Sequence, residues 1–115
     1  MTTTDYNELA VIANEDVKVL KKKGESYGDS WKARGGVGAF MMLARKWDRI
    51  ENQCKSHGYD IFEAIKSKKG GIPIDGLLDD VADLRRYLLL VEEEVTAQMN
   101  QPPRTYVDPD ADQRR

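Results

Sequence analysis

The chain contains few of the residues from which most zinc and disulfide sites are built. It has one cysteine, Cys54, and one histidine, His57, among 115 residues. A single cysteine cannot form an internal disulfide, and one cysteine with one histidine is too small a set for a tetrahedral zinc site. Any metal ion would therefore be bound through oxygen atoms, which favours Mg²⁺ or Mn²⁺.

Long apolar runs and an excess of basic charge are also missing. No stretch of 18 apolar residues is present, and the first residues lack a basic-then-apolar signal pattern, so we expect a cytoplasmic protein without a membrane segment. The net charge of −2 argues against direct nucleic-acid binding. At 40% hydrophobic and 33% charged residues, the composition predicts one helical domain over residues 1–100, followed by a polar, proline-containing tail over 101–115.

Apolar periodicity predicts an all-α helical bundle of three to four main helices, over about residues 5–23, 37–57, 59–68 and 75–99. We expect Thr4 or Asp5 to cap the first helix and Asp75 to cap the last, while Gly24 and Gly58 end the first two. The expected buried faces of the first two helices are Leu9, Ile12, Ala13, Val17 and Leu20, then Val37, Phe40, Leu43, Ala44, Trp47, Ile50 and Cys54.

The last long helix is expected to organise the fold. Its apolar residues recur at steps of three and four, as in a helix buried along one seam: Leu77, Val81, Leu84, Leu88, Val91 and Val95. Asp80, Asp83 and Tyr87 flank this seam, where carboxylates are costly unless positive charge balances them; a divalent metal is one candidate. The run Leu88–Leu90 is wider than one seam and predicts burial against a second subunit, in a homodimer or homotetramer.

A loop rich in glycine and aromatic residues is expected between the first two helices. It reads GESYGDSWKARGG over residues 24–36. In one interpretation Tyr27 and Trp31 pack on the core. In the other, which we favour, they stack on a base while lysine and arginine side chains bind phosphates. The GxxxxGK[ST] spacing of a Walker loop is absent from the sequence.

Two acidic pairs lie on predicted helices, Asp48-x-x-Glu51 and Asp80-x-x-Asp83. Residues three apart share a helix face, so two packed helices could bring four carboxylates and two magnesium ions to one point. The alternative is a solvated helix face with local ion pairs.

With these pairs, the segments SYGDSW at residues 26–31 and LARKWDRIEN at residues 43–52 resemble the all-α nucleoside triphosphate pyrophosphatases. This MazG-like superfamily also includes dimeric dUTPase-type enzymes, and the two segments look especially like its small phage-encoded members linked to nucleotide modification. The family carries an ExxE pair and an ExxD pair. Here aspartate replaces the first glutamate of each pair, and Asp79 competes with Asp80 as a ligand.

The resemblance implies a metal-dependent (deoxy)nucleoside triphosphate pyrophosphohydrolase, which releases a nucleoside monophosphate and pyrophosphate. Its magnesium or manganese would be bound by Asp48, Glu51, Asp80 and Asp83, which are also the catalytic residues, with Asp79 as a further candidate. The substrate would be bound by Tyr27 and Trp31 at the base and by Lys23 and Arg34 at the phosphates. Lys46 and Arg49 either bind phosphate as well or only balance the acids of their own helix. The alternative is a helical interaction protein or nucleotide-binding accessory protein without activity.

Overall fold

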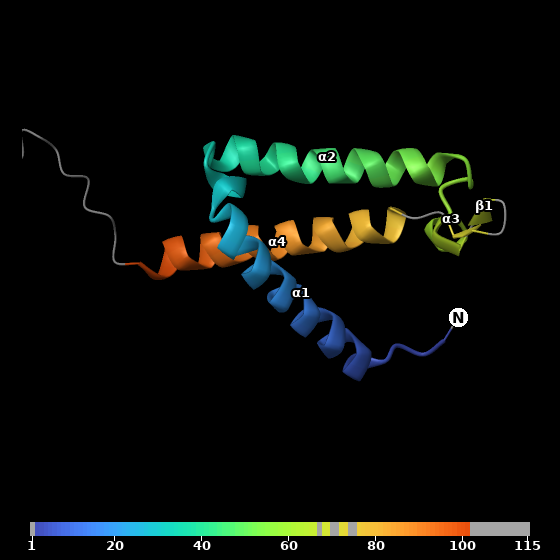
Figure 1. The fold of residues 1–115 in the computed structure, drawn as a ribbon, viewed down its shortest axis with the longest axis horizontal. Helices are drawn as coiled ribbons and strands as arrows, with labels where there is room; N and C mark the ends of the chain where they lie inside the picture. Colours follow the sequence, from blue (N-terminus) through green and yellow to red (C-terminus); the bar gives the residue numbers. More distant parts are fainter. Residues whose placement is uncertain (1, 67, 70–71, 74–75, 102–115) are drawn as a thin grey trace, which may run out of the picture.

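The computed structural model describes residues 2–66, 68–69, 72–73 and 76–101, and it confirms the predicted all-α fold (Figure 1). Its helical elements are α1 (Tyr6–Tyr27), the 3₁₀ turn η1 (Ser30–Lys32), α2 (Gly35–Lys55), α3 (Ile61–Lys66) and α4 (Leu77–Asn100). Two short strands that the sequence did not predict, β1 (Lys68–Lys69) and β2 (Ile72–Pro73), pair in antiparallel fashion before α4. The predicted cap Asp75 and the tail from residue 102 onward lie outside the described residues.

The ends of α1 follow from local chemistry. The Asp5 carboxylate accepts hydrogen bonds from the backbone N–H groups of Asn7 at 3.0 Å and Glu8 at 3.2 Å, which confirms Asp5 as the cap. Gly24 does not end the helix, contrary to the prediction. A glycine inside a helix costs only about 1 kcal/mol, and the helix stops instead at Gly28, whose φ of 57° is left-handed.

The helices form one close pair and one divergent arm. α2 and α4 lie side by side in opposite directions, whereas α1 crosses α4 obliquely and extends away from the pair (Figure 1). α3 packs against α2 and α4 near the C-terminal end of α2. The buried core lies at that end and consists of Ile50, Cys54, Ala64 and Leu77, surrounded by Ile61, Ile65, Val81 and Leu84. Within the described part of the chain, no helix is both long and apolar enough to cross a membrane.

Much of the predicted apolar surface of α1 and α2, and part of that of α4, is exposed in the single chain. The exposed members of the predicted faces are Leu9, Ala13, Val17, Val37, Phe40, Trp47, Leu88 and Val95. Burial within the single chain was therefore predicted wrongly for these side chains, because α1 diverges from the α2–α4 pair instead of covering it. For Leu88 the burial predicted against a second subunit stays a prediction. Ile50, Cys54 and Leu77 are buried as predicted. Large apolar side chains left in water in this number are typical of an interaction surface.

Candidate functional site

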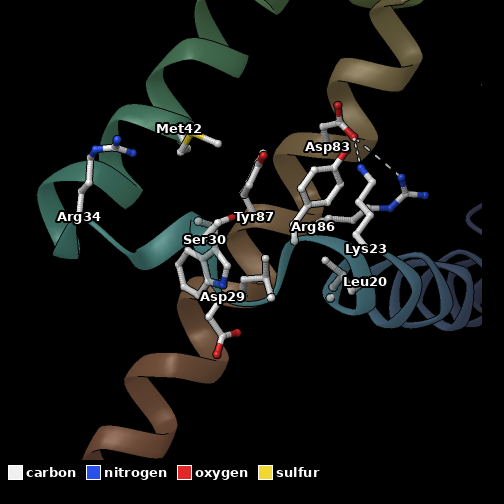
Figure 2. Close-up of a pocket in the computed structure, with 14 residues that line it drawn as sticks. Leu20, Lys23, Asp29, Ser30, Arg34, Met42, Asp83, Arg86 and Tyr87 are labelled. Atoms are coloured by element: carbon white, nitrogen blue, oxygen red, sulfur yellow. Dashed lines mark ion pairs between the residues drawn. The ribbon is translucent and has the colours of Figure 1, made fainter.

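A groove of about 540 Å³ lies where the end of α1, the turn η1 and the middle of α4 meet (Figure 2). The left-handed backbone at Gly28 ends α1 and turns the chain into η1, so the residues around this turn face α4. Four of the six predicted substrate-binding residues line the groove: Lys23, Tyr27, Trp31 and Arg34. The structure therefore brings together residues that the sequence selected only by type and by loop position.

Tyr27 and Trp31 are aromatic side chains of the groove lining, and an ion pair beside Trp31 joins η1 to α4. Trp31 is half-buried and Tyr27 is 71% exposed, so neither side chain belongs to the buried core. The Lys32 ammonium lies 5.8 Å from the centroid of the Trp31 ring and 2.6 Å from the Glu94 carboxylate on α4. The hydrogen bond to Glu94 raises the pKa of Lys32. This ion pair fixes η1, and with it the indole, against α4.

One side of the groove carries a cluster of charges around Asp83. Its carboxylate lies 3.7 Å from the Lys23 ammonium, 3.9 Å from the Arg86 guanidinium and 2.9 Å from the Lys46 ammonium. Figure 2 shows Lys23 and Arg86 beside Asp83, whereas Arg34 lies on the opposite side of the groove. A ligand that spans the groove would therefore meet positive charge at both ends.

Asp80 is buried among cationic and amide groups. Its carboxylate accepts a hydrogen bond from Gln53 Nε2 at 2.9 Å and lies 3.1 Å from Arg49 Nε and 3.7 Å from Lys46 Nζ. Burial acts to raise the pKa of Asp80, but the hydrogen bonds from Gln53 and Arg49 outweigh it, and the pKa lies below its ordinary value. Lys46 and Arg49 therefore balance acids of α4. The sequence had offered these two cations for phosphates or for the acids of their own helix.

The predicted metal-binding acids of α2, Asp48 and Glu51, have other surroundings than Asp80 and Asp83 on α4. Asp48 is exposed and lines a shallow hollow together with Arg45. Glu51 accepts a hydrogen bond from Trp47 Nε1 at 3.1 Å, and Asp79 is exposed. Across the described ranges, no three acidic, histidine or cysteine side chains converge as a metal site. The described residues therefore show no preassembled set of metal ligands, and a magnesium or manganese cofactor stays a prediction.

Asp16 on α1 is a buried carboxylate that was not predicted from the sequence. It accepts hydrogen bonds from Arg85 Nε at 2.6 Å, Arg85 Nη2 at 2.7 Å and Arg86 Nε at 2.8 Å. The bonds from Arg85 hold the pKa of Asp16 below its ordinary value, against the opposing effect of burial. A signal was present: Ile12, Asp16 and Val19 are spaced four and three apart, so this face of α1 carries an acid between apolar residues.

Comparisons of the chain with protein-family models, with curated protein sequences and with solved structures find no significant match. The resemblance to the MazG-like superfamily stays a prediction.

Proposed function

We propose that the protein is a metal-dependent (deoxy)nucleoside triphosphate pyrophosphohydrolase that binds its nucleotide in the groove. The observation that carries the proposal is the pairing of aromatic and cationic side chains around one cavity. Trp31 and Tyr27 offer flat surfaces for a base, and base stacking on an aromatic ring tolerates any base. Lys23, Arg86 and Arg34 offer the donors that phosphate oxygens require. Cleavage between the α- and β-phosphates is the part that the resemblance contributes.

Magnesium enters this proposal together with the substrate. In nucleotide sites Mg²⁺ is usually held by one or two carboxylates and by the substrate's phosphates, rather than by an all-protein cage. Asp80 and Asp83 have suitable oxygen atoms, one turn apart on α4, although lysine and arginine bind both of them in the single chain. A bound ion would neutralise phosphate charge and lower the pKa of a water molecule. The chain itself would hold the base and orient the phosphates.

The test is an assay of pyrophosphate release from a panel of deoxynucleoside triphosphates, with Mg²⁺ or with a chelator. The proposal expects one pyrophosphate per nucleoside monophosphate from at least one substrate, and no release with the chelator. Absence of release across the panel, or release of orthophosphate alone, would contradict it. Binding without turnover would favour the nucleotide-binding accessory protein. One observation supports that alternative, since Asp80 and Asp83 are already neutralised by neighbouring cations.

Replacement of Trp31 with alanine is expected to raise KM about tenfold while the melting temperature barely moves, because base stacking is worth roughly 1–3 kcal/mol. A core tryptophan would instead cost about 3–5 kcal/mol of stability. The Tyr6→Ala variant is the control, because Tyr6 is 78% exposed at the start of α1. Steady-state kinetics and thermal melts check the prediction. A destabilised Trp31→Ala variant with unchanged KM would return Trp31 to a structural role.

We also propose that the working form is a homodimer or homotetramer, because α2 exposes Val37 and Phe40 by 79% and 64%. Light scattering of the 13.1 kDa chain should therefore give the mass of two or four copies. We expect Phe40→Asp to lower that mass without reducing the helical circular dichroism signal, while Lys55→Asp, at the exposed end of the same helix, should not. A wild-type monomer at micromolar concentration would rule out the assembly.

A further inference from the structure

We propose that Lys23 and Arg86 form the subsite for the polyphosphate chain of the ligand, and that the Asp83 carboxylate occupies this subsite until an anionic ligand displaces it. The inference rests on the proposed function and deepens it, since it says which end of the groove takes the phosphates. It also assigns a role to Arg86, which the sequence did not select.

The balance of charge around the groove favours an additional anion. Ion pairs join α1, α2 and α4 into one continuous network with three carboxylates, Asp16, Asp80 and Asp83. Five lysine and arginine side chains pair with these three carboxylates, so the network carries more positive than negative charge. Lys23 and Arg86 are the two of the five that line the groove. An additional anion in the groove would therefore relieve repulsion within the network.

The distances around Asp83 show which of its cationic partners it holds closely. Its contact with Lys46, which does not line the groove, is 2.9 Å and therefore of hydrogen-bond length. Its contacts with Lys23 at 3.7 Å and with Arg86 at 3.9 Å are longer than a hydrogen bond. Asp83 is thus anchored on one side and only loosely associated with the two groove cations. A phosphate oxygen can therefore displace Asp83 from beside Lys23 and Arg86 and approach both cations more closely, while the Asp83 carboxylate keeps its contact with Lys46.

The Arg86 side chain is held in one orientation by a hydrogen bond. Its Nε donates to the buried Asp16 at 2.8 Å, so the guanidinium is held along one edge, and its Nη1 lies 3.9 Å from the Asp83 carboxylate at the groove. The side chain is only 18% exposed, which restricts its alternative positions. An arginine fixed in this way loses little conformational entropy on binding, and its planar donors match phosphate geometry. Asp16 acts here as a positioning residue.

The experiment is calorimetric titration of the full chain with inorganic tripolyphosphate in the absence of magnesium. Lys23→Gln should weaken binding about tenfold, as expected for one charge-assisted hydrogen bond. Lys22→Gln is the matched control, because Lys22 is an exposed neighbour on α1 that does not line the groove, and its Kd should change less than about twofold. Asp83→Asn should tighten binding severalfold, because the competing carboxylate charge is removed.

The inference is overturned if Lys23→Gln and Lys22→Gln bind tripolyphosphate alike, or if Asp83→Asn binds it no more tightly than the wild type. Lys23 is half-exposed, so its replacement does not endanger folding. If the titrations behave as expected but no deoxynucleoside triphosphate is cleaved, the subsite stands and the pyrophosphohydrolase proposal fails. If a triphosphate is cleaved and the two lysine variants bind alike, the proposed function stands and the subsite is wrong.

Discussion

Replacement of Asp16 with alanine is expected to lower the free energy of unfolding by about 3 kcal/mol, near the lower end of the range for breaking a buried ion pair. Asp16 is fully buried, and its loss leaves Arg85 and Arg86 without the carboxylate that both of them bind. We expect the lower end of the range because Arg85 is 38% exposed and can turn towards water. The effect should be largest in α1, which these contacts attach to α4.

The matched control is Glu15→Ala, which changes the exposed neighbour of Asp16 on the same helix and should alter stability by less than about 0.5 kcal/mol. Urea unfolding followed by circular dichroism gives both values. Equal stability of the two variants would mean that the buried ion cluster contributes nothing to the attachment of α1.

The same cluster predicts a pH dependence. The folded pKa of Asp16 lies below its ordinary value of 3.8, so its stabilising contribution is fully present above pH 3.8 and is lost as the pH falls through the folded pKa. The difference in stability between the wild type and Asp16→Ala should therefore shrink with acidification below pH 3.8. A difference that stays constant over this range would contradict the assignment.

Replacement of Asp80 or Asp83 with asparagine is expected to abolish magnesium-dependent pyrophosphate release and to leave the helical signal intact. Metal-assisted charge stabilisation is worth several kcal/mol, so we expect turnover to fall by more than about a hundredfold. Because Asp80 is buried and Asp79 is exposed, we expect Asp80→Asn to lower turnover more than Asp79→Asn does. Both variants keep the side-chain shape, which limits structural disturbance.

Glu92→Gln serves as the control for these two variants, because Glu92 is exposed further along α4 and should leave turnover unchanged. Pyrophosphate release at saturating substrate is the measurement. An Asp83→Asn variant with full turnover would remove this carboxylate from the reaction. An inactive Asp83→Asn variant that binds tripolyphosphate more tightly than the wild type would separate the role of Asp83 in turnover from its competition with the ligand.

The sequence predicted the elements of the fold better than their burial. Steps of three and four placed α4 correctly, and they placed Asp80 and Asp83 beside its packed seam, where the structure has them. Periodicity shows which face of a helix is apolar but not what covers it, so the exposure of Val37 and Phe40 could not be foreseen. Which of these faces is covered depends on the angle between α1 and the α2–α4 pair.

The residues of the candidate site that lie in one loop could be predicted from the sequence. Contacts between residues far apart in the sequence could not. Tyr27 and Trp31 stood out by type within a glycine-rich segment, and both line the groove. The partners of Asp16 are 69 and 70 residues away on α4, and no local spacing relates them. From the sequence, a divalent metal ion was the candidate to balance the charge of the acids on α4. In the single chain, Lys46 is one of the side chains that answer them.

The central claim is that a nucleoside triphosphate binds in the groove between α1, η1 and α4. Hydrogen exchange followed by mass spectrometry, with and without Mg²⁺ and a non-hydrolysable deoxynucleoside triphosphate, tests it most directly. We predict that added protection is concentrated in residues 23–36 and 83–90, which contain most of the groove lining. Unchanged exchange in both segments, or protection confined to the exposed face of α2 around Asp48, would contradict the account.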